Sequence, residues 1–306
     1  MFQLIRIRLL QIAVALGFVC VSSSAFAAIV PLSGVSNFKL TITYQGVSRS
    51  VLYFKPTAAS TTKVPLLVML HYNGGTPEAM STLTEVQELV RDYGIWVALP
   101  PVADGSWHDD PTDTSTTDDV GFLTTLIETS VASYPVDVKR VYMTGFSDGA
   151  MMTLRYACDR PDKIAAAAAV SGVMLKSLVS VCGSPSFATP MAMINGTADT
   201  IVKYSPGKYA ISISVPDSAK HWAKINGCGA APVVSNLADI APSDGTTVTL
   251  TAYLGCATGD SVDLYTVNNG GHTWPGSPYN LNYQGKTTFD IDGTLTVWNF
   301  VKGFSR

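Results

Sequence analysis

A serine between two glycines is the residue of this sequence best placed for covalent chemistry. Residues 145–149 read Gly-Phe-Ser-Asp-Gly, a G-x-S-x-G pattern centred on Ser147. The pentapeptide alone is common in tight turns, but an apolar run over 140–144 predicts a strand before it. A small-residue run over 150–157 predicts a helix after it. This strand–turn–helix context predicts that the Ser147 hydroxyl stands exposed on a sharp turn as a nucleophile.

A serine hydroxyl needs a base to accept its proton and a carboxylate to orient that base. After such a turn, the expected chain order is serine, acid, histidine, each following a later strand. Asp199 directly follows a predicted strand over 190–195, and His272 lies in a glycine-rich segment after a predicted strand over 261–267. We therefore expect Ser147 as the nucleophile, Asp199 as the acid and His272 as the base.

Further histidines and acids are weaker candidates for these roles. His221 lies inside a predicted helix and reads as a surface residue, whereas His108 lies in a tryptophan-containing loop that could line a cleft. His71 ends the first predicted buried strand and is expected near the oxyanion loop and the substrate. Three further acids do not directly follow a buried strand: Asp239, Asp260 and Asp263.

The negative charge that develops on a substrate oxygen when a serine attacks needs hydrogen-bond donors close to it. The backbone N–H of Asp148, at the start of the predicted helix, is one expected donor. The second is expected after the buried strand 65–70, from Asn73 or, failing that, from Tyr72.

Two tryptophans lie in the predicted loops beside this chemistry. Trp107 and Trp274 are expected to form an aromatic wall for the substrate, together with His71. The alternative for each tryptophan is packing in the core or under a loop.

The remaining pattern positions these residues on an α/β fold. Residues 37–54 alternate apolar and polar side chains and predict an antiparallel hairpin that turns at Gln45-Gly46. Buried strands are predicted over 65–70, 94–100, 140–144, 164–170 and 190–195, and later strands over 247–254 and 261–267. Helices are predicted over 76–91, from Asp118 onward, and over 150–157, 218–225 and 293–304. The alternation indicates a mostly parallel central sheet flanked by helices.

The N-terminus predicts export. Arg6 and Arg8 precede an apolar run over 9–21 and an A-x-A site at 25–27. We expect a signal peptide over 1–27, cleavage before Ala28, and one catalytic domain over 28–306. The apolar run is short for a membrane span, so no stable membrane insertion is expected. The formal net charge of −3, without a basic run, also argues against nucleic acid as a partner.

The cysteines fit an exported chain. Four remain after the predicted cleavage: Cys158, Cys182, Cys228 and Cys256. An even number predicts two disulfides, with three possible connectivities. The sequential pairing closes the shortest loops, and buried free thiols are the alternative. No cysteine or histidine pair has metal-ligand spacing, so no metal is expected.

Five segments together resemble a known family. They are 118–122, 145–152, 195–199, 226–228 and 270–276, the last reading Gly-Gly-His-Thr-Trp-Pro-Gly. They are similar to the polyhydroxybutyrate depolymerase/feruloyl esterase family of α/β-hydrolases, which also holds carbohydrate esterases of family 1. The resemblance covers roughly residues 37–304 and rests most on the His-Thr-Trp-Pro-Gly and Asn-Gly-Cys motifs.

The resemblance implies the α/β-hydrolase fold, no cofactor, and the roles given above for Ser147, Asp199 and His272. It also implies a Cys228–Cys256 disulfide near the histidine loop. One departure stands at 71–73, where His-Tyr-Asn replaces the usual His-Gly-x. The phenol of Tyr72 is expected near the mouth of the site, where it would affect acyl-group selectivity.

The expected function is a secreted serine esterase, of the poly- or oligo(3-hydroxybutyrate) depolymerase type, acting on a small or polymeric ester. The first alternative is a feruloyl or acetyl xylan esterase acting on plant cell-wall polysaccharide. We expect no extra binding domain of the kind that dedicated polymer-degrading relatives carry, which favours soluble oligoesters or ester side groups. The sequence is also compatible with an inactive exported binding protein of the same fold, an acyltransferase or a peptidase.

Overall fold

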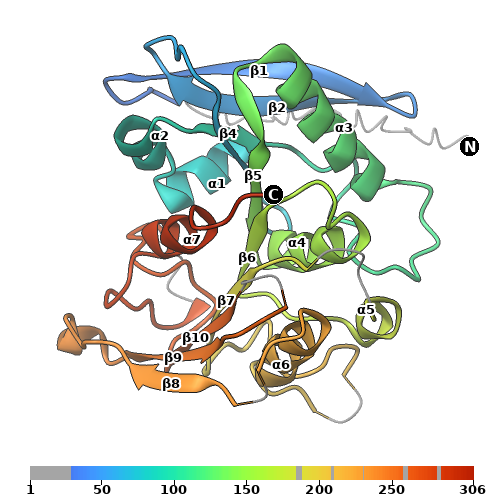
Figure 1. The fold of residues 1–306 in the computed structure, drawn as a ribbon. Helices are drawn as coiled ribbons and strands as arrows, with labels where there is room; N and C mark the ends of the chain where they lie inside the picture. The colour runs from blue at the N-terminus through green and yellow to red at the C-terminus, as the bar shows by residue number, and fades with distance from the viewer. Residues whose placement is uncertain (1–28, 184–187, 208–209, 230, 258–260, 281–283) are drawn as a thin grey trace, which may run out of the picture. The chain divides into compact units, whose positions relative to one another are not determined.

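The computed structural model describes residues 29–306, except 184–187, 208–209, 230, 258–260 and 281–283. The predicted signal peptide over 1–27 and the cleavage point before Ala28 lie outside the described residues. Pro31–Arg306 form one compact unit, whose ribbon is drawn in Figure 1.

The unit begins with the predicted hairpin. β1 (Val35–Tyr44) pairs antiparallel with β2 (Val47–Pro56), so the turn consists of Gln45 and Gly46. Both turn residues have positive φ, 48° and 80°, as in the type I′ turns that match the twist of paired strands. The hairpin prediction is confirmed.

A ten-stranded sheet runs through the described part of the unit, in the order β1-β2-β4-β3-β5-β6-β7-β10-β9-β8. Its six central strands are parallel to one another: β3 (Val64–Leu70), β4 (Trp96–Leu99), β5 (Val136–Phe146), β6 (Ala166–Val170), β7 (Met191–Gly196) and β10 (Val262–Asn268). The antiparallel strands β9 (Thr247–Tyr253) and β8 (Val233–Asn236) complete the far edge. Of these strands, β3, β4, β6 and β7 are buried on both faces, as the sequence predicted.

Helices cover both faces of the sheet (Figure 1). One face carries α1 (Pro77–Thr84), α2 (Gln87–Tyr93) and α7 (Gly293–Val301). The other carries α3 (Asp119–Ser133), α4 (Asp148–Asp159), α5 (Lys176–Val181) and α6 (Val215–Ile225). A short 3-10 turn, η1 (Pro242–Asp244), precedes β9. The mostly parallel sheet with flanking helices is the predicted fold class.

Some local predictions differ from the structure. The helix expected over 76–91 is broken into α1 and α2, because Glu85 adopts a left-handed conformation with φ of 49°. The apolar spacing continues across the break, so periodicity could not show it. The sequence also missed β8, whose four residues are all exposed and therefore lack alternation, and α5, which has only six residues.

A buried ion pair joins the hairpin to α3. Arg49 on β2 donates to Asp119 Oδ1 at 2.5 Å, and the two side chains are 4% and 0% exposed. The second oxygen of Asp119 accepts the backbone N–H of His108 at 2.9 Å. This carboxylate therefore holds both a buried cation and the loop before α3.

Asp119→Ala is expected to destabilise the fold by about 3–5 kcal/mol, because it leaves the Arg49 charge buried without a partner. Chemical denaturation measures the loss. The control is Glu128→Ala, which removes one of the exposed partners of Lys163 and should cost less than about 1 kcal/mol. Equal losses in the two variants would contradict the expectation.

Candidate active site

Ser147 stands on the turn between β5 and α4. Its φ is 57°, an unusual value for a residue with a side chain, and its N–H donates to the carbonyl of Val170 at 2.9 Å. A Cβ on Gly149 would lie 2.5 Å from the carbonyl oxygen of Leu70, and one on Gly145 would overlap the backbone of Gly149. Close backbone approach on both sides therefore requires both glycines of the motif.

Three side chains from separate loops meet at this turn. His272 Nε2 lies 2.9 Å from Ser147 Oγ, and His272 Nδ1 lies 2.7 Å from Asp199 Oδ2. Each residue follows the carboxyl end of a parallel strand, namely β5 for the serine, β7 for the aspartate and β10 for the histidine. All three are buried, with Ser147 the most exposed at 9%.

The surroundings of Asp199 fix the protonation pattern. Its Oδ1 accepts the backbone N–H groups of Ile201 and Val202, both at 2.8 Å, which leaves Oδ2 to face the imidazole. A carboxylate accepts only, so Nδ1 of His272 carries the proton. Nε2 then has a lone pair directed at the Ser147 hydroxyl.

The histidine loop is itself held in place. The backbone N–H of His272 donates to the carbonyl of Gln284 at 2.7 Å, and that of Gly271 donates to the carbonyl of Lys286 at 2.8 Å. The imidazole also lies against the ring of Phe146, with centroids 5.0 Å apart. These contacts fix the imidazole between the serine and the aspartate.

A pocket of about 250 Å³ opens over the serine and histidine. Tyr72 and Asn73, expected near the mouth of the site, both line it. The sequence did not predict the rest of the lining, which consists of Leu83, Phe146, Ile201, Tyr279 and Gln284. These five residues come from four segments that are far apart in the sequence, and they share no motif. Only Phe146, inside the G-x-S-x-G pattern, had a sequence signal that could have found it.

The structure contradicts the predicted aromatic wall. Trp107 and Trp274 are 2% and 1% exposed, and His71 is 1% exposed. The two indole N–H groups donate into the protein, Trp107 to the carbonyl of His71 at 2.8 Å and Trp274 to Thr294 Oγ1 at 3.0 Å. Burial lowers the pKa of His71, so its ring is neutral and Nδ1–H donates to the carbonyl of Tyr72 at 2.8 Å. A sequence motif identifies an aromatic residue, but it does not show whether other segments of the chain pack over that residue and bury it.

Of the remaining candidate bases and acids, none replaces the pair at the serine. His108 lies between Asp104 and Asp113, and His221 contacts the carbonyl of Cys182. Asp260 lies outside the described residues. Among the carboxylates that the structure describes, Asp199 is the one hydrogen-bonded to His272.

Two acidic side chains lie behind the elbow. Asp148 Oδ2 accepts the backbone N–H of Trp107 at 2.9 Å, and burial raises the pKa of this carboxyl. Burial, and then the charge of Asp148, raise the pKa of Asp109 from 3.8 to about 7. Within the described residues, Asp109 Oδ2 has no hydrogen-bond partner. Folded protein therefore keeps a proton on Asp109 that the unfolded chain releases near pH 4.

Because the pKa of Asp109 is raised, we expect Asp109→Asn to gain thermal stability, relative to the native protein, as the pH rises. The stability associated with the Asp109 proton is fully present below about pH 4 and is lost as the pH rises through about 7. Asparagine does not titrate. The difference in melting temperature, variant minus native, should therefore be roughly 2–4 °C larger at pH 8 than at pH 5. Thermal unfolding at both pH values measures it, and an equal difference at the two would contradict the raised pKa.

The structure forms both disulfides of the sequential pairing. Cys158, in α4, is joined to Cys182 after α5, and Cys228, after α6, is joined to Cys256 after β9. In the described ranges there is no group of three or more residues suited to hold a metal ion. No helix in the same ranges is long and apolar enough to cross a membrane.

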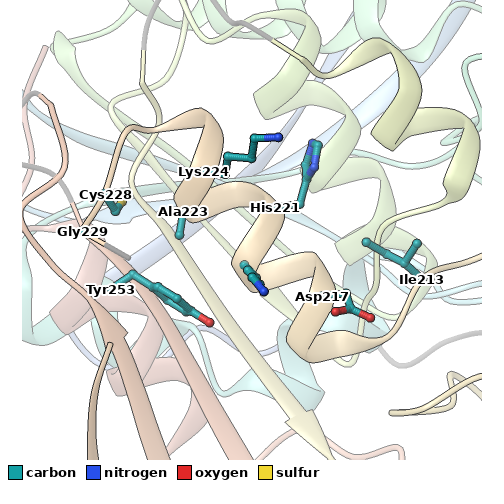
Figure 2. A pocket seen from close by; sticks show the side chains of 9 residues that line it. Ile213, Asp217, His221, Ala223, Lys224, Cys228, Gly229 and Tyr253 are labelled. Atoms are coloured by element: carbon teal, nitrogen blue, oxygen red, sulfur yellow. The ribbon is translucent and has the colours of Figure 1, made fainter. Parts of the chain in front are cut away.

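A second pocket, of about 510 Å³, lies along α6 (Figure 2). Its charged and titratable side chains come from the helix (Asp217, Lys220, His221 and Lys224), and Tyr253 joins them from β9. None of its described lining residues lines the pocket over Ser147. Ser147 and His272 therefore line the smaller of these two pockets and not the larger one.

Comparison with known families identifies the family of this chain. The family model described as "Esterase PHB depolymerase" matches residues 48–221, more than half of the chain. The chain belongs to this esterase PHB depolymerase family. The matched range contains Ser147 and Asp199 and ends before His272.

Two curated proteins resemble this esterase PHB depolymerase family member. Feruloyl esterase B of Piromyces equi is 30% identical over 254 residues, which are 79% of this chain and 42% of that protein. Acetylxylan esterase A of Emericella nidulans is 32% identical over 113 residues, which are 35% of this chain and 37% of that protein. The chain thus spans less than half the length of either relative.

A solved structure shares the fold. The acetyl xylan esterase from Aspergillus awamori superposes with a TM-score of 0.60 at 20% identity, covering 78% of this chain and 94% of that chain. The likeness shows that this family member has the α/β-hydrolase fold.

Proposed function

We propose that this protein is an exported serine esterase that hydrolyses carboxylic esters with Ser147, His272 and Asp199. The observation that carries the proposal is the chain of two contacts, 2.9 Å from Ser147 Oγ to His272 Nε2 and 2.7 Å from His272 Nδ1 to Asp199 Oδ2. Ser147 and His272 also line the pocket, through which a substrate can reach the hydroxyl.

The first half-reaction acylates the serine. His272 Nε2 accepts the hydroxyl proton as Ser147 Oγ bonds to the ester carbonyl carbon, and the carbonyl oxygen becomes an oxyanion. Asp199 stabilises the imidazolium that forms. When the carbon–oxygen bond to the alcohol breaks, His272 returns the proton to the leaving alcohol. In the second half-reaction water replaces the serine as nucleophile, and Ser147 recovers its proton through the same imidazole.

Two backbone donors stabilise the oxyanion in this proposal. The N–H of Asp148 is the first of α4, and the first N–H groups of a helix have no partner inside the helix. The helix dipole adds to its attraction for negative charge. The second donor is the N–H of Asn73, on the loop after β3 that lines the same pocket.

The proposed substrates are oligomeric or polymeric esters of 3-hydroxybutyrate. The family description supports this class, and the pocket of about 250 Å³ has room for a small acyl unit. The second candidate is a feruloyl or acetyl xylan ester, supported by the names of the two relatives. Export rests on the N-terminal sequence and the two disulfides.

A hydrolysis panel on the mature protein tests the proposal. The panel compares a 3-hydroxybutyrate oligomer, methyl ferulate, an acetylated xylan oligomer and short p-nitrophenyl esters, each with Ser147→Ala as the control. Serine-dependent turnover led by the hydroxybutyrate oligomer supports the first substrate class, and preference for ferulate or acetyl xylan supports the second. No turnover of any ester by folded protein would instead support the inactive binding protein.

A further inference from the structure

Trp107 touches both sides of the proposed oxyanion site. Its indole N–H donates to the carbonyl of His71 at 2.8 Å, and its backbone N–H donates to Asp148 Oδ2 at 2.9 Å. Its ring also lies against the ring of His71, with centroids 5.4 Å apart. His71 begins the segment that carries Asn73, and Asp148 carries the other proposed donor. One buried residue therefore connects the two backbone segments that must act on one substrate oxygen.

We propose that Trp107 is a positioning residue that sets the separation of the two oxyanion donors. The inference rests on the proposed function, since it concerns the same site. It replaces the substrate-binding role expected from sequence, because Trp107 is 2% exposed and does not line the described pocket.

The separation of these donors matters because oxyanion stabilisation depends on geometry. Donors act at 2.7–3.1 Å from the oxyanion, so a shift of about 0.5 Å in one of them weakens catalysis. Ligand-binding loops belong to the less stable parts of a fold, so their position has to be fixed by specific contacts. The Tyr72 carbonyl accepts both His71 Nδ1–H, at 2.8 Å, and the backbone N–H of Gly75, at 2.9 Å, which makes the turn around Asn73 rigid. The Trp107 indole then connects this rigid turn to the other side of the site.

The loop that carries Trp107 is also held in place by hydrogen bonds. The guanidinium of Arg155, on α4, donates from Nη1 to the carbonyls of His108 and Asp110, at 3.0 and 2.8 Å. The backbone N–H of His108 donates to Asp119 at 2.9 Å. The tryptophan loop is thus bound to the helix that begins at Asp148. Trp107 therefore fixes the position of the loop after β3 relative to that helix.

Trp107→Phe tests this role, because it keeps an aromatic ring and removes the indole N–H, together with part of the indole ring volume that the control below also removes. We expect kcat to fall about 10- to 100-fold while KM stays within about twofold, since the lost interaction acts in the transition state. The affinity for an alkylboronic acid, whose serine adduct places an oxygen at the oxyanion site, should fall by the same factor as kcat/KM.

Trp222→Phe is the matched control. Trp222 is 1% exposed, and its indole N–H donates to the carbonyl of Thr189 at 2.8 Å, so the substitution removes the same kind of bond in α6. We expect a similar loss of thermal stability with kcat unchanged within about twofold.

Four outcomes overturn the role of Trp107. These are unchanged kcat in Trp107→Phe, an equal loss of kcat in Trp222→Phe, unchanged boronate affinity, or a raised KM at constant kcat, which would make Trp107 a substrate contact. If Trp107→Phe does not fold, Asp148→Ala removes the other contact and should lower kcat about tenfold at constant KM. If Ser147→Ala keeps full activity, the proposed function itself fails. If only the Trp107 results fail, the proposed function stands.

Discussion

Ser147→Ala is expected to lower kcat/KM by about 10⁴- to 10⁶-fold, the largest loss available from a single side chain of this site. Alanine removes the atom that bonds to the ester carbon. His272 then has no hydroxyl to deprotonate. The activity that survives comes from binding and from the oxyanion donors acting on a water molecule. Initial rates on the best ester of the panel measure it.

Ser81→Ala is the matched control for this result. Ser81 is buried at 2% exposure in α1, and among the described residues its hydroxyl has no partner, so its loss should leave the rate within about twofold. A second check is the double variant of Ser147→Ala with His272→Ala. Because the two residues act as a unit, it should be no slower than Ser147→Ala alone, within about threefold. A multiplicative loss would show that they work independently.

Asp199→Asn is expected to lower kcat/KM by about 10³- to 10⁴-fold with little loss of stability. The backbone N–H groups of Ile201 and Val202 hold the oxygen end of the side chain, at 2.8 Å each. The asparagine NH₂ must then face His272 Nδ1, which can only accept from it. The imidazole proton moves to Nε2, and the base no longer has a lone pair for the Ser147 hydroxyl.

Measurements of melting temperature and rate together distinguish a changed imidazole tautomer from a general loss of folding. Asp199→Asn keeps both backbone contacts, so its melting temperature should stay within about 3 °C of the native protein. Asp199→Ala loses those contacts as well and should melt lower. An asparagine variant that keeps a tenth or more of the native activity would contradict the tautomer argument.

The sequence predicted the parts of this protein that depend on short stretches of chain. The strand, tight turn and helix around Ser147 follow from five residues and their flanks, because the backbone geometry of the turn requires glycine at 145 and 149. The hairpin turn at Gln45-Gly46 is local in the same way. Chain order was enough to select Asp199 and His272, since parallel strands deliver their following loops to one edge of the sheet.

Properties that involve distant residues were decided by the tertiary structure alone. Tryptophan is apolar over most of its surface, so a pattern could not tell whether Trp107 and Trp274 face a substrate or the interior. Nor could it show that Trp107 joins His71 to Asp148, or that Ile201 and Tyr279 share a pocket with the serine. The sequence by itself thus predicted the three residues that the structure brings together at Ser147, because the turn follows from local backbone geometry and the loop order follows from the parallel strands. Packing between segments decided which side chains surround them and hold them in place, because burial is a property of the whole fold.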